Sequence, residues 1–168
     1  MHTKRVRYAI DRHGYRPNVG IIVCNDCRQV LWARRASQEG WQFPQGGVER
    51  NETAQEAAYR ELYEEVGLRP DHVRLVGCTR RWLRYDVPYR VLRRTRARRF
   101  KGQKQLWFLF QLVGNDTDVC LSVSHKPEFD QWCWVDYWEP LERIVAFKRE
   151  VYDMALKELE PLLRDQAV

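Results

Sequence analysis

Three glutamates between positions 61 and 65 have the clearest capacity for chemistry in this sequence. Glu61 and Glu65 are four residues apart, and Glu64 is three from Glu61, so on an α-helix all three lie near one face. Like charges stacked in this way repel each other, and a divalent cation such as Mg²⁺ would turn that repulsion into binding energy. The same triplet also fits an ordinary solvated acidic helix face.

The residues around the triplet carry the signals of a helix with defined ends. Thr53 and Glu56 match a capping box, with Thr53 as the N-cap. Gly67 stands where a helix C-terminus favours a left-handed residue, and Pro70 blocks continuation. An apolar stripe can form from Ala57, Ala58, Leu62 and Val66.

The segment from Gln42 to Gly47 precedes this helix, and its proline and paired glycines predict a loop. A turn of this kind beside an acidic helix can offer backbone carbonyls to a metal ion and backbone N–H groups to phosphate. It therefore favours a metal and phosphate site over a merely solvated helix face.

The rest of the chain predicts an α/β fold, with a mixed sheet between helices. The β-branched run Val19–Cys24 predicts a buried strand, with Val30–Ala33 as its hairpin partner. Apolar residues at helical spacing from Ile144 to Leu163 predict a C-terminal amphipathic helix. Further strands are expected at Val73–Arg84, Gln105–Val113 and Trp132–Val135.

Length and composition narrow the class of protein. The chain has 168 residues, which predicts one domain. Its formal net charge of +6 favours an anionic partner such as nucleic acid or nucleotide, or reflects an ordinary basic surface. The sequence shows neither the apolar segment of a signal peptide nor a run near the roughly 20 apolar residues of a membrane span. We therefore expect a cytoplasmic protein with reduced thiols and no membrane partner.

Five cysteines are present, and Cys24 and Cys27 form a lone C-x-x-C pair. A zinc site would need two more ligands at motif spacing. Scattered thiols are therefore the expectation.

One segment resembles the signature of a known family. Gly46, five residues, Glu52, seven residues and then Arg60-Glu61-Leu62-x-Glu64-Glu65-x-Gly67-Leu68 match the Nudix box at every fixed position. The resemblance implies a Nudix-type α/β/α sandwich and a metal-dependent phosphoanhydride hydrolase. It implies that Glu61, Glu64 and Glu65 bind metal together with the Gly46 carbonyl, and that Glu52, Arg60 and Gly67 are structural.

Motifs outside the box resemble those of the bacterial RNA pyrophosphohydrolases within this family. They include Gly14–Gly20, Trp41–Gly47, Gly102–Gln105 and Phe147–Arg149, and the match runs from about Gly14 to about Tyr152. The similarity separates this group less cleanly from the dinucleoside polyphosphate hydrolases. We therefore assign residues 14–163 to the catalytic domain, 1–13 to an N-terminal tail and 164–168 to a C-terminal tail.

The same resemblance implies further site residues. Glu128 would be an additional metal ligand or the general base. The implied phosphate-binding residues are Arg16, Arg35, Gln45, Gln103 and Lys148. Phe147 and Tyr85 would stack on bases.

The segment Arg80–Lys104 is dense in arginine and lysine and contains a single acid, Asp86. Basic residues can neutralise an RNA backbone, and the interleaved aromatic residues can stack on unpaired bases. A solvated connection between strands has the same composition. The segment therefore indicates an RNA contact without excluding that second interpretation.

These observations predict an RNA 5′-pyrophosphohydrolase that converts 5′-triphosphate or diphosphate ends to monophosphate ends and so initiates mRNA decay. Mg²⁺ is the expected cofactor, with Mn²⁺ able to substitute. The expected partners are RNA 5′ ends and nucleotide polyphosphates, and a monomer is expected. The alternatives are a dinucleoside polyphosphate hydrolase and a non-catalytic RNA-binding module on the same fold.

Overall fold

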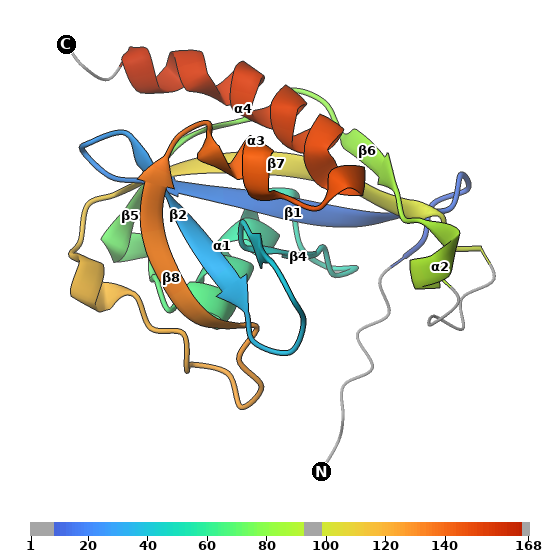
Figure 1. Ribbon diagram of the computed structural model, residues 1–168, viewed down its shortest axis with the longest axis horizontal. Helices are drawn as coiled ribbons and strands as arrows, with labels where there is room; N and C mark the ends of the chain where they lie inside the picture. Colours follow the sequence, from blue (N-terminus) through green and yellow to red (C-terminus); the bar gives the residue numbers. More distant parts are fainter. Residues whose placement is uncertain (1–8, 93–98, 166–168) are drawn as a thin grey trace.

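A mixed β-sheet with a long helix on each side forms the framework of the protein (Figure 1). The computed structural model describes residues 9–92 and 99–165. In that part of the chain the strands are β1 (Tyr15–Cys24), β2 (Gln29–Arg35), β3 (Trp41–Gln42), β4 (Gln45–Gly47), β5 (Val73–Cys78), β6 (Leu83–Asp86), β7 (Gly102–Leu112) and β8 (Phe129–Asp136). The helices are α1 (Ala54–Val66), α2 (Tyr89–Leu92), α3 (Glu139–Arg143) and α4 (Arg149–Arg164). The predicted fold class is confirmed.

Strand β1 lies at the centre of the sheet and runs parallel to β7, from Tyr15 opposite Gly102 to Cys24 opposite Gln111. Side chains alternate between the two faces of a strand. Ile22 of β1 accordingly packs in the cluster under α4, whereas Ile21 packs in the cluster over α1. Because both faces are covered, the apolar run is continuous rather than alternating with polar residues.

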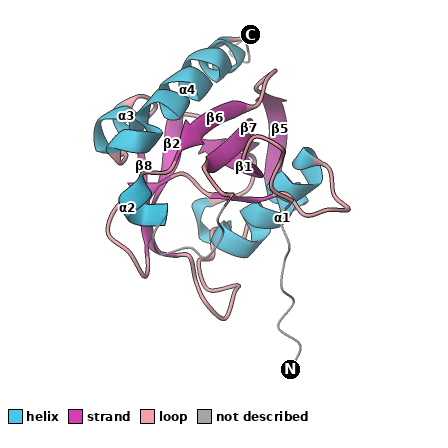
Figure 2. Ribbon diagram, turned by 90° about the vertical axis from the view of Figure 1, so that its right-hand side faces the viewer, coloured by secondary structure: helices cyan, strands magenta, loops and turns pink. Residues whose placement is uncertain are grey.

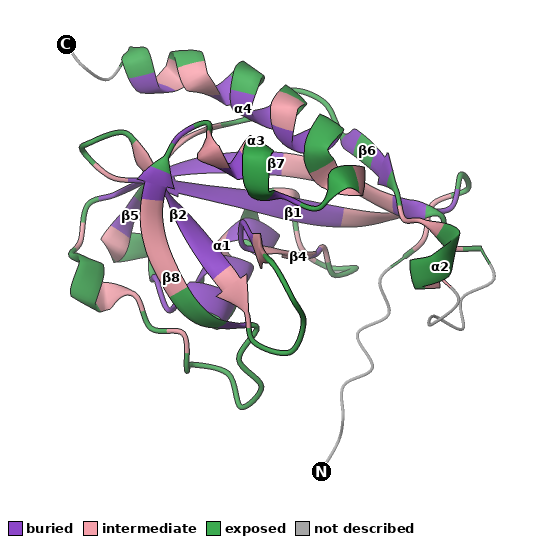
Figure 3. Ribbon diagram, viewed as in Figure 1, coloured by how far each residue is buried: buried purple, intermediate pink, exposed green. Residues whose placement is uncertain are grey.

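Helices α1 and α4 lie on opposite faces of the sheet and bury the stripes that their sequences predict (Figure 2). Figure 3 shows the buried side of α4 against the sheet and its exposed side towards solvent. Fully burying one leucine contributes roughly 2 kcal/mol, so these stripes fix both helices firmly. The buried residues of α4 are Val151, Tyr152, Ala155, Leu156, Leu159 and Leu163.

The segment predicted as a loop at Gln42–Gly47 contains two short strands instead. Strand β3 pairs with β2, and β4 pairs antiparallel with the start of β1, with Val19 opposite Gly46. The glycines tolerate this pairing because they place no side chain between the strand and α1. The segment Gln42–Gly47, called the box loop below, is therefore held to the sheet by backbone hydrogen bonds.

The predicted strand Val73–Arg84 is divided in the structure. Strand β5 pairs with the second half of β7, and β6 pairs with its first half. Between them, the Thr79 backbone N–H donates to the Trp107 carbonyl at 2.9 Å, and the Trp107 N–H donates to Thr79 Oγ1 at 3.1 Å. The break lies where β5 ends and the chain turns to start β6.

The predicted hairpin of β1 and β2 is correct in direction but short. The two strands share the register pair Cys24 and Val30, and β2 pairs along its whole length with β8. Tertiary pairing with β8 therefore decides the position of β2.

Both predicted tails lie largely outside the described residues. Of the N-terminal one, residues 9–13 are described, and Asp11 accepts backbone N–H groups of His13 and Tyr15 at 2.8 and 3.0 Å. Asp11 also pairs with Lys104 at 3.0 Å. Part of the basic stretch, residues 93–98, also lies outside the described part of the chain.

Among residues 9–92 and 99–165, the structure contains no helix with the length and apolar character needed to cross a membrane.

The Cys24 thiol is buried and donates to the Phe110 carbonyl at 3.3 Å, whereas Cys27 lies exposed in the following turn.

Candidate functional site

Helix α1 has the ends that its sequence predicts. The Glu56 backbone N–H donates to Thr53 Oγ1 at 3.1 Å, and the Thr53 N–H donates to Glu56 Oε2 at 2.7 Å. Gly67 adopts the left-handed conformation with φ of 74°, and its N–H donates to the Tyr63 carbonyl. A Cβ at Gly67 would also meet the Cys120 backbone at 2.7 Å. These caps fix the two ends of the helix, and its buried apolar stripe sets the rotation of the glutamate face relative to the sheet.

Two glutamates of α1 are carboxylates buried against the sheet. Glu61 is 7% exposed and Glu65 is 9% exposed. Burial raises the pKa of Glu61 to about 7, against the opposing effect of Arg60. Burial together with the charges of Glu61 and Glu128 raises the pKa of Glu65 well above its usual value. Such raised pKa values mark carboxylates whose burial is only partly offset by hydrogen bonds and positive charge.

Arg60 forms ion pairs with the glutamates of this cluster. Its guanidinium grips both carboxylate oxygens of Glu52, at 2.6 and 3.0 Å, and donates to the Gly47 carbonyl at 2.8 Å. It also donates to Glu61 Oε1 at 2.7 Å and reaches Glu64 Oε2 at 3.4 Å. Glu52 has a lowered pKa, caused first by its hydrogen bonds from Arg60. Arg60 thus ties the box loop to the glutamate face.

Strand β4 closes over the two buried glutamates. The Gln45 backbone N–H donates to Glu65 Oε2 at 3.1 Å. A Cβ built at Gly46 would overlap the Glu61 carboxylate. A side chain at position 46 would therefore fill the space that the carboxylate occupies, which gives the glycine of the box its physical reason.

A cavity of about 320 Å³ opens in front of these groups. It brings together the three helix glutamates and Glu128, which lies 63 residues beyond Glu65 in the sequence. The Glu128 carbonyl accepts the Ala36 N–H at 2.9 Å, which fixes its loop beside the end of β2. The residues that line the cavity are Arg16, Asn18, Gln45, Gly46, Gly47, Glu61, Glu64, Glu65, Gln103 and Glu128.

The donor set of this cavity suits a hard divalent cation, because carboxylate and carbonyl oxygens are its preferred ligands. Within the described residues, no group of three or more acidic, histidine or cysteine side chains already stands at ligand spacing. Hydrogen bonds from Arg60 and Gln45 engage one oxygen each of Glu61 and Glu65. A bound cation would supply positive charge against the burial and the like-charge repulsion that raise both pKa values.

A second cavity, of about 480 Å³, contains Arg35, Phe147 and Lys148 in its wall. Lys148 Nζ donates to Gln42 Oε1 at 3.2 Å. Burial and then the charge of Arg35 lower the pKa of Lys148 to about 8, against the attraction of Glu128 and Glu65. Lys148 therefore lines this cavity and also interacts electrostatically with Glu65 and Glu128 of the first cavity.

The predicted site residues thus separate into two groups. The cavity at α1 contains the predicted metal ligands together with Arg16, Gln45 and Gln103, and the neighbouring cavity contains Arg35, Phe147 and Lys148. Phe147 and Lys148 belong to a 3₁₀ turn directly before α4, rather than to its first turn.

Tyr85 does not fit the base-stacking role predicted for it. Its side chain is 7% exposed and packs in the core under α4. Strand β6 alternates, so Leu83 and Tyr85 point inward while Arg84 and Asp86 are exposed. The Tyr85 ring lies 6.0 Å from the Phe147 ring and supports it from the protein interior, leaving no free face for a base.

A family model described as the NUDIX domain matches residues 14–155 of the chain. The protein belongs to the Nudix family. Nudix hydrolases act on nucleotide phosphoanhydrides and generally use divalent metal ions.

Solved structures of Nudix proteins share the fold of this chain. An Ap4A hydrolase from C. elegans, in a binary complex, superposes with a TM-score of 0.65 at 18% identity, covering 89% of this chain and 98% of its own. The dihydroneopterin triphosphate pyrophosphohydrolase of E. coli gives 0.67 at 21%, covering 82% and 92%. A NUDIX hydrolase from Listeria monocytogenes gives 0.66 at 22%, covering 89% and 94%.

Two buried polar residues of the sheet position the box loop, and the sequence alone did not identify them. Gln105 Nε2 donates to Asn18 Oδ1 at 2.8 Å and to Gln45 Oε1 at 3.2 Å. Asn18 and Gln105 are buried and sit opposite each other on β1 and β7. The sequence contains a signal for this pair, since a polar residue at the start of an otherwise apolar buried strand needs a hydrogen-bond partner.

Tyr152 of α4 is a second positioning residue missed in the sequence. The Phe43 backbone N–H donates to the Tyr152 hydroxyl at 3.0 Å, and the two rings pack with centroids 5.1 Å apart. This bond links α4 to the segment that carries the glycines of the Nudix box. In the sequence, Tyr152 is visible only as one apolar position of the helix.

Proposed function

We propose that this Nudix protein is an RNA 5′-pyrophosphohydrolase, converting a 5′-triphosphate or diphosphate end into a monophosphate end with release of pyrophosphate or phosphate. One observation carries the proposal. The carboxylate cavity adjoins the second cavity, called the groove below, whose wall contains the cations Arg35 and Lys148 and the aromatic ring of Phe147. A 5′-phosphorylated RNA end has the same order of groups, with a phosphate chain followed by a nucleoside.

The residues at the carboxylate cavity would hold a divalent cation, with Mg²⁺ the first candidate and Mn²⁺ an alternative. Its ligands would be Glu61, Glu64 and Glu65, with the Gly46 carbonyl and Glu128. When bound, the cation supplies positive charge to the phosphate oxygens and lowers the pKa of water. Arg60 supports this arrangement by holding Glu52 and Glu61 in fixed positions.

The polar side chains around the carboxylates would bind the phosphate chain. Arg16 and Gln103 line the cavity beside Gln45, and arginine grips phosphate oxygens with two parallel donors. Arg35 and Lys148 would meet the phosphates from the side of the neighbouring groove. Together they would orient the chain so that its anhydride bond lies over the carboxylates.

Two further residues complete the proposed chemistry. The proton of the attacking water would pass either to Glu128, an exposed carboxylate in the cavity wall, or to one of the helix glutamates. Phe147 is half-buried and backed by Tyr85, so its outer face would stack on a base.

A dinucleoside polyphosphate hydrolase is the second candidate. The groove of about 480 Å³ offers space and an aromatic side chain for one nucleoside, which would suit a dinucleotide as well as an RNA end. The Ap4A hydrolase of C. elegans has the same fold. The basic Arg80–Lys104 segment favours a polymer, because a dinucleotide needs fewer positive contacts.

The test compares hydrolysis of 5′-triphosphorylated RNA and of diadenosine tetraphosphate at several salt concentrations, with and without a chelator. We expect faster, salt-sensitive cleavage of RNA that the chelator abolishes and Mg²⁺ restores. E65Q should lose about 10³-fold or more in turnover, since metal-assisted charge stabilisation contributes several kcal/mol, while retaining RNA binding. Faster cleavage of the dinucleotide without salt sensitivity would reverse the ranking, and full activity with chelator would refute the metal site.

A further inference from the structure

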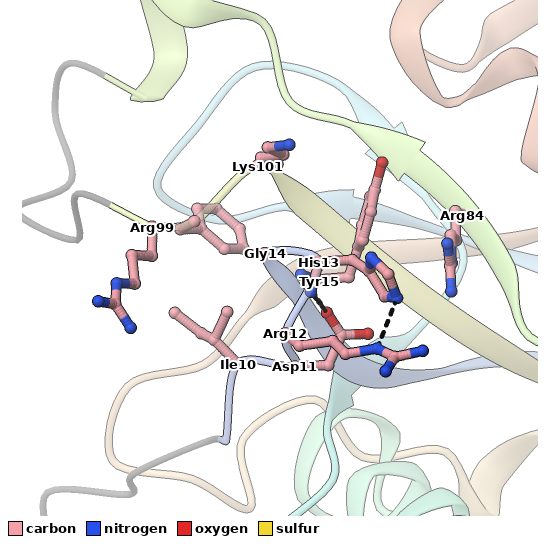
Figure 4. A pocket seen from close by; sticks show the side chains of 10 residues that line it. Ile10, Asp11, Arg12, His13, Gly14, Tyr15, Arg84, Arg99 and Lys101 are labelled. Carbon is pink, nitrogen blue, oxygen red and sulfur yellow. Dashed lines mark hydrogen bonds between the residues drawn. The ribbon is translucent and has the colours of Figure 1, made fainter.

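We propose that a basic pocket at the start of β1 binds the phosphodiester backbone of single-stranded RNA, downstream of the 5′-terminal nucleotides. This inference rests on the proposed RNA substrate. The pocket, drawn in Figure 4, has a volume of about 880 Å³. The residues that line it are Ile10, Asp11, Arg12, His13, Gly14, Tyr15, Arg84, Arg99, Phe100 and Lys101.

Four exposed cations give this pocket its charge: Arg12, Arg84, Arg99 and Lys101. Figure 4 shows them arranged around His13 and Tyr15. Among the ion pairs of residues 9–92 and 99–165, none involves these four cations. Their charge therefore remains available for an anionic ligand.

Asp11 is the only acid among the described residues of the pocket wall, and it does not cancel this charge. Its carboxylate accepts the N–H groups of Tyr15 and His13 and pairs with Lys104. The Tyr15 hydrogen bond is the largest of the effects that lower its pKa. Because Lys104 lies outside the pocket wall and already balances Asp11, the four exposed cations form a net positive surface.

Backbone hydrogen bonds build this pocket from three separate segments. The Lys101 N–H donates to the Gly14 carbonyl at 2.8 Å, and the Val87 N–H donates to the Lys101 carbonyl at 2.9 Å. Gly14 has φ of 90°, and a Cβ there would lie 2.6 Å from the Arg99 carbonyl. The cations therefore lie on segments that backbone hydrogen bonds hold together, although these segments are distant in the sequence.

The pocket meets the carboxylate cavity at the start of β1, although the two take side chains from opposite faces of that strand. Tyr15 lines the pocket and Arg16, the next residue of β1, lines the cavity. The Arg16 guanidinium lies over the Phe100 ring, 4.9 Å from its centroid, so one contact joins the two walls. A strand of RNA whose 5′ phosphates lie on the carboxylates would pass Arg16 and reach the basic pocket.

The chemistry of the pocket favours a polymer over a small nucleotide. Each cation can neutralise one phosphate of a polyanion, whereas the phosphates of a dinucleotide would already occupy the cavity. Aromatic rings lie among the cations, with Arg84 over the Tyr15 ring at 5.0 Å, as in sites that bind single-stranded nucleic acid. Single-stranded RNA supplies both repeating phosphates and unpaired bases.

The test measures binding of a 5′-hydroxyl RNA 12-mer, which has no hydrolysable end, to the wild type and to R99Q/K101Q. Both side chains are exposed, so an unchanged thermal midpoint will verify folding. We expect about tenfold weaker binding of the 12-mer and a shallower salt dependence, by about 1.4 in the logarithmic slope. The KM for a triphosphorylated dinucleotide should remain unchanged.

The matched control is K157Q/R164Q, which removes the same charge from exposed positions of α4. An equal loss of binding in this control, or unchanged binding in R99Q/K101Q, would overturn the pocket. A tenfold rise in the KM for the triphosphorylated dinucleotide in R99Q/K101Q would also overturn the proposal, because the pocket would then bind the 5′ end itself. If the 12-mer behaves as expected but triphosphorylated RNA is not hydrolysed, the pocket stands and the proposed function fails.

Discussion

The carboxylate cavity and the basic pocket meet at the start of β1, yet they are built in opposite ways. The cavity holds Glu61 and Glu65 at 7% and 9% exposure, whereas the four cations of the pocket are exposed. A buried charge loses hydration and must be held by the scaffold, while an exposed charge remains hydrated and adjustable. On the proposed function, the cavity would fit one geometry of ligand, whereas the pocket would follow the repeating phosphates of an RNA strand.

The two regions also differ in what they cost the folded protein. Burial and mutual repulsion raise the pKa values of Glu61 and Glu65, so their ionisation opposes folding until a cation arrives. The pocket cations are solvated and impose little such penalty. Changes in the cavity should accordingly have large effects that depend on metal, and changes in the pocket should have modest effects that depend on salt.

The largest effect that would sharpen this contrast concerns stability and pH. A group whose folded pKa is raised stabilises the protein below its unfolded pKa and loses that contribution as pH rises through the folded value. For Glu61, with a change from 4.5 to about 7, this corresponds to about 3 kcal/mol. Without divalent cation, we expect the free energy of unfolding to fall between pH 5 and pH 7.5.

Denaturant titrations at both pH values will measure this change, and Mg²⁺ should restore stability at pH 7.5 by binding the native state. E61Q is the control and should reduce the pH dependence, leaving the part that comes from Glu65. A higher free energy of unfolding at pH 7.5 than at pH 5, measured without divalent cation, would contradict the proposed cost of ionising the buried glutamates. R99Q/K101Q should leave the pH profile unchanged.

The next effect concerns Gly46. In G46A the added Cβ would overlap the Glu61 carboxylate, so the carboxylate must move. We expect turnover to fall by about 100-fold, since displacement of a catalytic group by about 1 Å has effects of that size. Binding of the 5′-hydroxyl RNA 12-mer should be unchanged, which steady-state kinetics and a binding titration will test.

G77A is the matched control, because a Cβ at Gly77 would also meet a side chain, the Leu162 tip at 2.6 Å. That contact lies between β5 and α4, away from the cavity, so its cost should appear in stability alone. Equal losses of turnover in both variants would mean that G46A acts through stability and would remove the role given to Gly46.

The smallest effect concerns Tyr152, which fixes the box loop from α4. Y152F leaves the buried Phe43 N–H without its acceptor, at a cost of about 1–3 kcal/mol. We expect turnover to fall by about tenfold, with RNA binding at the pocket retained. Y137F is the control, since the Tyr137 hydroxyl donates to the Leu156 carbonyl at 2.8 Å and has no link to the loop. Equal turnover in Y152F and Y137F would contradict this positioning role.

Local signals made helix α1 predictable. Its N-cap, its C-terminal glycine and the spacing of its glutamates are each determined within a few residues, and the structure confirms the helix and both caps. The buried stripe of α4 was predictable for the same reason. Strand boundaries were less accurate, because pairing with β7 divides β5 from β6 and pairing with β8 places β2.

Residue types alone could not decide orientation or long-range pairing. Tyr85 looked suited to base stacking, but alternation along β6 turns it into the core. Asn18 and Gln105 are separated by 87 residues and meet only because β1 and β7 run parallel in register. The support that they give to Gln45 follows from that register.

The sequence by itself determined that three carboxylates share one helix face beside a glycine-rich turn, because helical periodicity and capping are local properties of the chain. Only the tertiary structure decided that Glu61 and Glu65 are buried, that Glu128 joins them, and that a basic pocket adjoins them. Burial and the meeting of distant segments depend on how the sheet pairs and what packs against it, and no short stretch of sequence contains that information.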